Sequence, residues 1–109
     1  DGTCDFYTKP DKPSGNSLRP AKDREVIKVK TVRLDTWAKE HNVPSLDIVK
    51  IDVEGHELEA LEGMGNLLFS VNILLAEVRF VDRPTLFHKL ANFLEPYHLQ
   101  LFSIAGLYY

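Results

Sequence analysis

The stretch 46–53 constrains the fold more than any other part of this sequence, because its apolar residues are nearly continuous. A strand with one face in water alternates apolar and polar residues, whereas a parallel strand covered on both faces is apolar almost throughout. Gly55 follows at once, where the chain must turn out of the strand. The stretch therefore predicts a parallel strand covered on both faces, and residues 72–78 repeat the pattern.

The segments around these two strands have helical periodicity. From 56 to 68, apolar residues recur every three or four positions with glutamates between them, which predicts one amphipathic helix. Asp35 or Thr36 is expected to cap a shorter helix. That shorter helix is predicted at 36–42, and a third helix at 84–96, from Pro84 to Pro96. Further strands are predicted at 4–8, 26–34 and 98–104.

The alternation of strands and helices predicts an α/β fold, with an open, mostly parallel sheet and helices on both faces. In such sheets ligands bind beyond the carboxyl ends of the strands. Two strand exits carry polar residues, at 52–55 and at 77–79. We therefore expect the functional side chains at these exits.

Charge and cysteine content restrict the partners. The formal net charge is −3 and the 13 basic residues are scattered, so neither a nucleic acid nor an anionic membrane is expected as a partner. A single cysteine, Cys4, cannot form an internal disulfide, and no apolar run is long enough to span a bilayer. A cytoplasmic location is expected.

Two motifs resemble those of the FkbM family of S-adenosylmethionine-dependent methyltransferases. The first is valine-arginine-leucine-aspartate-threonine-tryptophan at 32–37, in which Arg33 stands where the family has threonine. The second runs from 47 to 63 and contains lysine-isoleucine-aspartate-valine-glutamate-glycine at 50–55. The strand that ends at Glu77 is also similar to the next strand of the family, and the resemblance covers roughly residues 26–104.

The resemblance implies a Rossmann-like class I methyltransferase fold, S-adenosylmethionine as the cofactor, and methyl transfer to a hydroxyl oxygen of a small molecule or sugar. The wider class binds the donor with a glycine-rich turn after the first strand, and this sequence has none. We therefore expect residues 1–109 to be the carboxyl-terminal portion of such a domain, missing its first strands. In this layout 1–24 is a variable loop and edge-strand segment and 25–109 carries the strand–helix repeats. On its own, this portion is expected to be inactive and to bind S-adenosylmethionine weakly or not at all.

The candidate catalytic residues are Asp52, Glu54 and Glu77. A carboxylate at a strand exit suits methyl transfer to oxygen, because the acceptor hydroxyl must lose its proton as the new bond forms. Asp52 is also the candidate cofactor-binding residue. Glu54, Lys50 and His56 are the candidate substrate-binding residues.

The same residues also have structural interpretations. Lys50 can form an ion pair with Asp52 or Glu54, and Glu77 can pair with Lys50 or Arg79, because a buried charge needs a partner. These alternatives leave the role of each residue open.

The acids near the helix start raise two further possibilities. Glu54 and Glu57 can complement the dipole at the amino end of the following helix. Asp52, Glu54 and His56 alternate along the chain, but they share no established metal-ligand spacing, so no metal site is predicted.

The competing hypothesis is a non-catalytic α/β interaction module. A parallel sheet without its central neighbour exposes an apolar edge that invites pairing with another chain, so a homodimer through the sheet edge is expected in that case. Loss of activity without loss of stability on Asp52→Ala indicates an enzyme, whereas loss of stability indicates a structural module.

Overall fold

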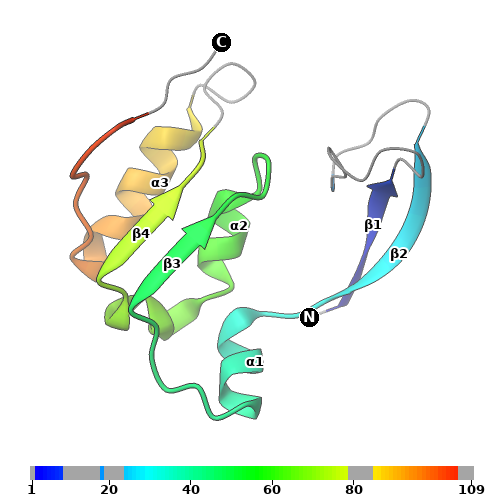
Figure 1. The fold of residues 1–109 in the computed structure, drawn as a ribbon, viewed down its shortest axis with the longest axis horizontal. Helices are drawn as coiled ribbons and strands as arrows, with labels where there is room; N and C mark the ends of the chain where they lie inside the picture. Colours follow the sequence, from blue (N-terminus) through cyan, green and yellow to red (C-terminus); the bar gives the residue numbers. More distant parts are fainter. Residues whose placement is uncertain (1, 9–17, 19–23, 79–84, 106–109) are drawn as a thin grey trace.

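The computed structural model describes residues 2–8, 18, 24–78 and 85–105. Strand β1 (Gly2–Thr8) pairs with β2 (Glu25–Thr31) in an antiparallel hairpin that lies apart from the remaining elements (Figure 1). Asp5 and Lys28 are directly opposite in this register, and their side chains form an ion pair. The strands predicted at 4–8 and 26–34 are therefore present, but they pair with each other and do not extend the parallel sheet.

Strands β3 (Ile48–Ile51) and β4 (Ile73–Ala76) form a two-stranded parallel sheet. In its register Ile48 lies opposite Ile73, and Ile51 lies opposite Ala76. Both strands are shorter than the apolar stretches that predicted them. The parallel pairing predicted from those two stretches is confirmed, but their predicted coverage on both faces is wrong for the described residues, because Ile48, Ile73 and Leu75 are exposed.

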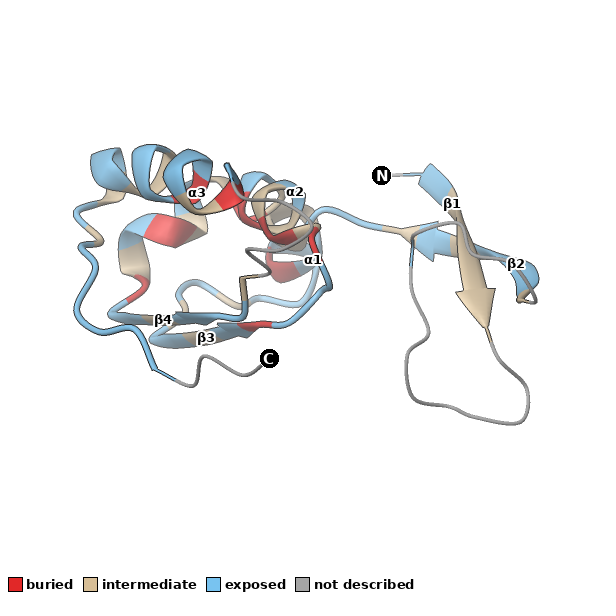
Figure 2. Cartoon of the chain, turned by 90° about the horizontal axis from the view of Figure 1, so that it is seen from above, coloured by how far each residue is buried: buried red, intermediate tan, exposed pale blue. Residues whose placement is uncertain are grey.

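The helices cover one face of this sheet. Helices α2 (Glu57–Glu62) and α3 (Leu86–Leu94) lie on the same side of β3 and β4 (Figure 2). On the opposite face Ile48, Ile73 and Leu75 are 65%, 52% and 56% exposed. The mixed α/β class is confirmed. For the described residues, however, the prediction of helices on both faces is wrong, because no described element packs over these three side chains.

The hydrophobic core lies between β3 and β4 and the helices. Val49 and Leu74 point towards it, on the face opposite to Ile48 and Ile73, because side chains alternate along a strand. The core brings together segments far apart in the sequence, and burying this apolar surface is the main force that holds them. Its buried members are Ile51, Leu61, Met64, Leu68, Val71, Leu86 and Leu90.

The predicted helix at 56–68 is two segments. Helix α2 ends at Glu62, and the short 3-10 helix η1 (Gly65–Ser70) follows. Gly65 has φ +51°, a left-handed conformation that interrupts an α-helix. Leu61, Met64 and Leu68 are nevertheless fully buried, so the apolar stripe was predicted correctly although the continuous helix was wrong.

Helix α1 (Leu34–Glu40) begins two residues before its predicted start. Arg33 is the N-cap residue and makes no side-chain cap, so the predicted capping by Asp35 or Thr36 is wrong. Asp35 instead lies in the first turn, where its Oδ1 accepts the main-chain N–H of Thr36 at 2.8 Å.

The chain after α3 forms a 3-10 turn and then an extended segment. The turn η2 (Glu95–Tyr97) contains Pro96, and His98 follows with φ +61°. Residues 98–105 form no strand, so the strand predicted at 98–104 is wrong. Pro84, the predicted start of the last helix, lies outside the described residues. Within the described part of the chain, no helix has the length and apolar character needed to cross a bilayer.

Candidate functional site

The exits of β3 and β4 lie side by side, as predicted from the sequence. The main-chain N–H of Glu77 donates to the carbonyl oxygen of Ile51 at 3.0 Å, which extends the parallel ladder beyond the two strands. Because Ile51 is opposite Ala76, the next residues, Asp52 and Glu77, leave the sheet at the same edge (Figure 1). This edge is the candidate functional site.

The side chains at this edge are accessible to solvent. Lys50, Asp52 and Glu77 are all exposed, and Lys50 lies opposite Leu75 on the open face of the sheet. Among the described residues, no ion pair joins Lys50 to Asp52 or to Glu77. These two structural pairings are therefore wrong, and Arg79, the other predicted partner of Glu77, lies outside the described residues.

The chain leaves β3 through a left-handed turn. Glu54 has φ +51° and Gly55 has φ +100°, and the N–H of His56 donates to the carbonyl oxygen of Val53 at 3.3 Å. Glycine adopts this conformation without strain, but for a glutamate it costs about 1–2 kcal/mol. Gly55 thus has the turn role predicted for it, and Glu54 is held, exposed, in an unfavourable conformation.

Glu57, the first residue of α2, is the charged side chain that the described core buries completely. Its Oε1 accepts the N–H of Gly55 at 3.0 Å, whereas its Oε2 is buried and has no hydrogen-bond partner. The sequence predicted only a contribution to the helix dipole. Its position two residues after the turn glycine was the available signal for this contact.

His56 lies next to Glu57 and is half-buried. Its Nδ1 is 3.8 Å from Oε1 of Glu59, and its Nε2 is buried without a hydrogen-bond partner. Lys50, Asp52 and Glu77 are thus exposed at the strand exits, whereas His56 is half-buried at the N-cap of α2.

Arg33 and Asp35, from the motif at 32–37, join the start of α1 to the end of α2. The Nε and Nη2 atoms of Arg33 donate to the two carboxylate oxygens of Asp35 at 3.1 and 2.8 Å. This guanidinium lowers the pKa of the Asp35 carboxyl group below its ordinary value. The Asp35 N–H donates to the carbonyl oxygen of Gly63 at 2.9 Å, and Arg33 also donates to that of Glu62 at 3.2 Å. Asp35 therefore has a structural role, remote from the strand exits.

The glycines that follow α2, Gly63 and Gly65, are half-buried and lie close to neighbouring atoms. A Cβ atom on Gly65 would lie 2.5 Å from Oδ2 of Asp35, and one on Gly63 would touch the carbonyl oxygens of Ala60 and Glu59. Gly63 and Gly65 thus do not form an open loop around a ligand. Nor do the described residues bring three His, Cys, Asp or Glu side chains together in an arrangement for a metal ion.

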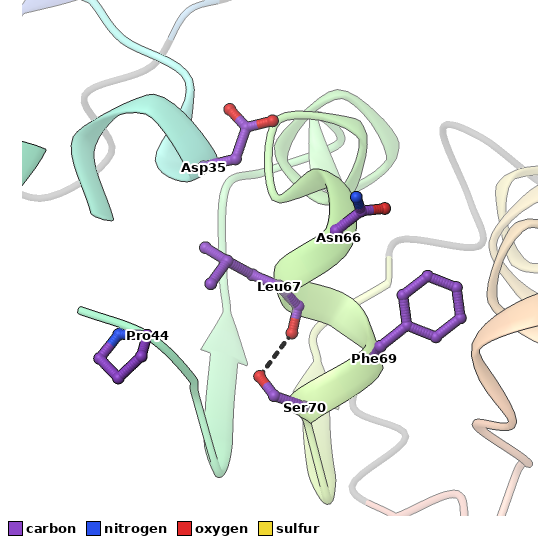
Figure 3. Close-up of a pocket in the computed structure, with 6 residues that line it drawn as sticks. All are labelled: Asp35, Pro44, Asn66, Leu67, Phe69 and Ser70. Atoms are coloured by element: carbon purple, nitrogen blue, oxygen red, sulfur yellow. Dashed lines mark hydrogen bonds between the residues drawn. The ribbon is translucent and has the colours of Figure 1, made fainter. Parts of the chain in front are cut away.

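An open depression lies at the other end of the sheet (Figure 3). The hydroxyl of Ser70 accepts the N–H of Leu46, just before β3 begins, and donates to the carbonyl oxygen of Leu67. The depression therefore lies near the amino ends of the strands, away from their exits, and we do not assign the functional site there. Its lining residues are Asp35, Pro44, Asn66, Leu67, Phe69 and Ser70.

Known proteins similar to this chain are methyltransferases. The methyltransferase FkbM domain matches residues 1–101. The hexuronic acid methyltransferase AglP of Haloferax volcanii is 36% identical over 74 residues, which are 68% of this chain and 31% of that protein. The match thus spans about a third of the length of AglP. No solved structure matches the chain.

Proposed function

Because the chain belongs to the FkbM family of methyltransferases, we propose that it takes part in methyl transfer from S-adenosylmethionine to a hydroxyl oxygen of a sugar. The observation that carries the proposal is the hydrogen bond from the Glu77 N–H to the Ile51 carbonyl oxygen, because it holds the two acidic strand exits together. We further propose that β3 and β4 belong to a Rossmann-like sheet, in which ligands bind at this edge.

The described residues fit the reacting end of the methyl donor. A sulfonium centre is positively charged, and Asp52 offers an exposed carboxylate with no ion-pair partner among the described residues. Gly63 and Gly65 are already packed against the protein and are unsuited to surround the nucleoside. We therefore assign Asp52 to the donor, which supplies an electrophilic methyl group when it is bound.

Glu54 is assigned to the acceptor hydroxyl. The hydroxyl oxygen must lose a proton as it forms the new carbon–oxygen bond, and a carboxylate within hydrogen-bond reach can accept that proton. Glu54 is exposed on the turn that follows β3, two residues after Asp52. Asp52 can therefore face the methyl donor while Glu54 faces the acceptor hydroxyl. Glu77, at the neighbouring strand exit, is assigned to a second hydrogen bond with the acceptor, which would orient it.

The acceptor class that fits best is a sugar that carries a carboxylate. Lys50 is exposed on the strand just before Asp52, and an ammonium group there would attract an anionic acceptor to an edge that is otherwise acidic. The named activity of AglP, methylation of a hexuronic acid, agrees in chemical class with this assignment.

Transfer of an isotopically labelled methyl group tests the proposal. Because residues 1–109 alone are expected to be inactive, the chain is assayed as part of a whole FkbM-type domain that also carries the glycine-rich donor-binding turn, here called the assembled domain. The assembled domain is incubated with methyl-labelled S-adenosylmethionine and matched saccharides that end in a hexuronic acid or in the corresponding neutral hexose. We expect labelled product from the hexuronic acid, with the label on a hydroxyl oxygen as an alkali-stable ether; a label that alkali releases as a methyl ester would refute transfer to the hydroxyl. Absence of label in every acceptor would refute methyl transfer, whereas equal labelling of both acceptors would refute only the role of the carboxylate.

The exposed apolar face of the sheet supports a second candidate function, a non-catalytic interaction module. Ile48, Ile73 and Leu75 would be covered by a second copy of the chain. In that case Ile73→Asp shifts a dimer to a monomer in light scattering, and the methyl-transfer assay remains negative.

A further inference from the structure

The turn between β3 and α2 needs an interaction that holds it in place. Glu54 is a non-glycine residue at φ +51°, and Gly55 follows at φ +100°. A left-handed glutamate is strained, and such a conformation persists only where its surroundings fix it. If the turn relaxed, the Glu54 carboxylate would move relative to Asp52.

Glu57 provides that interaction from inside the protein. Its side chain is 0% exposed, and its Oε1 accepts the Gly55 N–H at 3.0 Å. The acceptor therefore reaches back from the first residue of α2 to the centre of the turn. The His56 N–H also spans the turn, to the carbonyl oxygen of Val53 at 3.3 Å, but the Glu57 carboxylate is the group that holds the Gly55 N–H itself.

The burial of this carboxylate is costly, which argues that the contact has a specific role. Placing a charged group in a core is unfavourable unless all its oxygens are paired, and Oε2 of Glu57 has no hydrogen-bond partner. An apolar side chain would fill the same position at lower cost, but it could not accept the Gly55 N–H. The unfavourable free energy of burial thus falls on Glu57, the residue that fixes the turn.

We infer that Glu57 is a positioning residue, which holds the Glu54–Gly55 turn through the Gly55 N–H and thereby sets the place of the Glu54 carboxylate at the site. The inference rests on the proposed function for its catalytic consequence. Its structural part, the restraint of the turn, stands on the hydrogen bond alone.

Two substitutions separate the hydrogen bond from the charge. Glu57→Gln keeps an acceptor oxygen and removes the charge, whereas Glu57→Leu removes the acceptor and keeps much of the bulk. Glu59→Gln is the matched control, because it removes a carboxylate from the same helical turn at an exposed position.

Hydrogen–deuterium exchange at the Gly55 amide is measured in the full chain, and kcat and KM for methyl transfer are measured in the assembled domain. In Glu57→Leu we expect exchange to be about tenfold or more faster, since a buried hydrogen bond is lost. We also expect kcat to fall about tenfold or more with KM for the donor unchanged. Glu57→Gln and Glu59→Gln should match the unsubstituted protein in both measurements.

The possible outcomes are distinguishable. Wild-type exchange at Gly55 in Glu57→Leu would overturn the inference, and so would unchanged kcat. If Glu57→Leu does not fold, Glu57→Gln decides, because a tenfold loss of kcat there would show that the charge matters and the hydrogen bond does not. If the unsubstituted protein transfers no methyl group, the proposed function is wrong, and the exchange rate at Gly55 still decides whether Glu57 holds the turn.

Discussion

Replacing Gly65 by alanine is expected to lower the free energy of unfolding by about 2–3 kcal/mol. The left-handed φ of +51° costs an alanine about 1–2 kcal/mol. The added Cβ would also lie 2.5 Å from Oδ2 of Asp35, so the Asp35 carboxylate must move and weaken its hydrogen bonds with Arg33 and Thr36. Losing hydrogen bonds of this kind adds roughly 1 kcal/mol.

Urea denaturation of the full chain, followed by circular dichroism, measures this loss. Gly63→Ala is the matched control, because Gly63 has a right-handed φ of −69° and its added Cβ would meet its nearest neighbour at 3.4 Å, an ordinary contact. That substitution should be neutral or stabilising by up to about 1 kcal/mol. Equal stability of the two variants, at equal dependence on urea concentration, would refute the reasoning about Gly65.

Three further predictions concern the stability of the hydrophobic core, the stability of the protein at acid pH and the KM for the acceptor. Leu61→Ala, at a fully buried position, should lower the free energy of unfolding by about 2–5 kcal/mol in the same assay, against about 0.5 kcal/mol or less for Leu101→Ala, whose side chain is 63% exposed. Asp35 has a lowered pKa in the folded state, so its stabilising contribution is complete above its ordinary value of 3.8 and is lost as the pH falls through the folded pKa. In Asp35→Asn the free energy of unfolding should therefore fall less between about pH 5 and pH 2 than in the unsubstituted protein. An identical pH dependence of the free energy of unfolding in the two proteins would contradict this prediction. Lys50→Gln should raise KM for a hexuronic acid acceptor by about tenfold and leave KM for a neutral acceptor unchanged, as steady-state kinetics can determine.

Apolar patterning predicted the elements that pack on one another. The stretches 46–53 and 72–78 were predicted as parallel strands, and each contains one, β3 and β4, because a nearly continuous apolar run is typical of a parallel strand. The same pattern predicted that both faces would be covered, which is wrong for the described residues, since Ile48 and Ile73 are as apolar as Val49 and Leu74 but remain exposed. Coverage depends on what packs against the strand, and a single strand does not encode it.

Local backbone conformation was the less predictable part. Helix α2 ended at Glu62, earlier than the periodicity indicated, and Gly65 follows with a left-handed φ at a position where Asp35 leaves no room for a Cβ atom; both features depend on tertiary packing. The site was predicted at the strand exits, and Asp52 and Glu77 do leave the sheet together. The burial of Glu57 was not predicted, because a glutamate at the start of a helix is usually exposed and favours the helix dipole from there.

The most direct test of the central claim is the turnover of Glu54→Gln in the assembled domain, with S-adenosylmethionine and a hexuronic acid acceptor. The account predicts that kcat falls by about 10²–10⁴-fold, because an amide cannot accept the hydroxyl proton, while the thermal unfolding midpoint stays near that of the unsubstituted protein. Turnover equal to that of the unsubstituted protein would contradict the assignment of Glu54, and no turnover by either protein would contradict methyl transfer at this edge of the sheet.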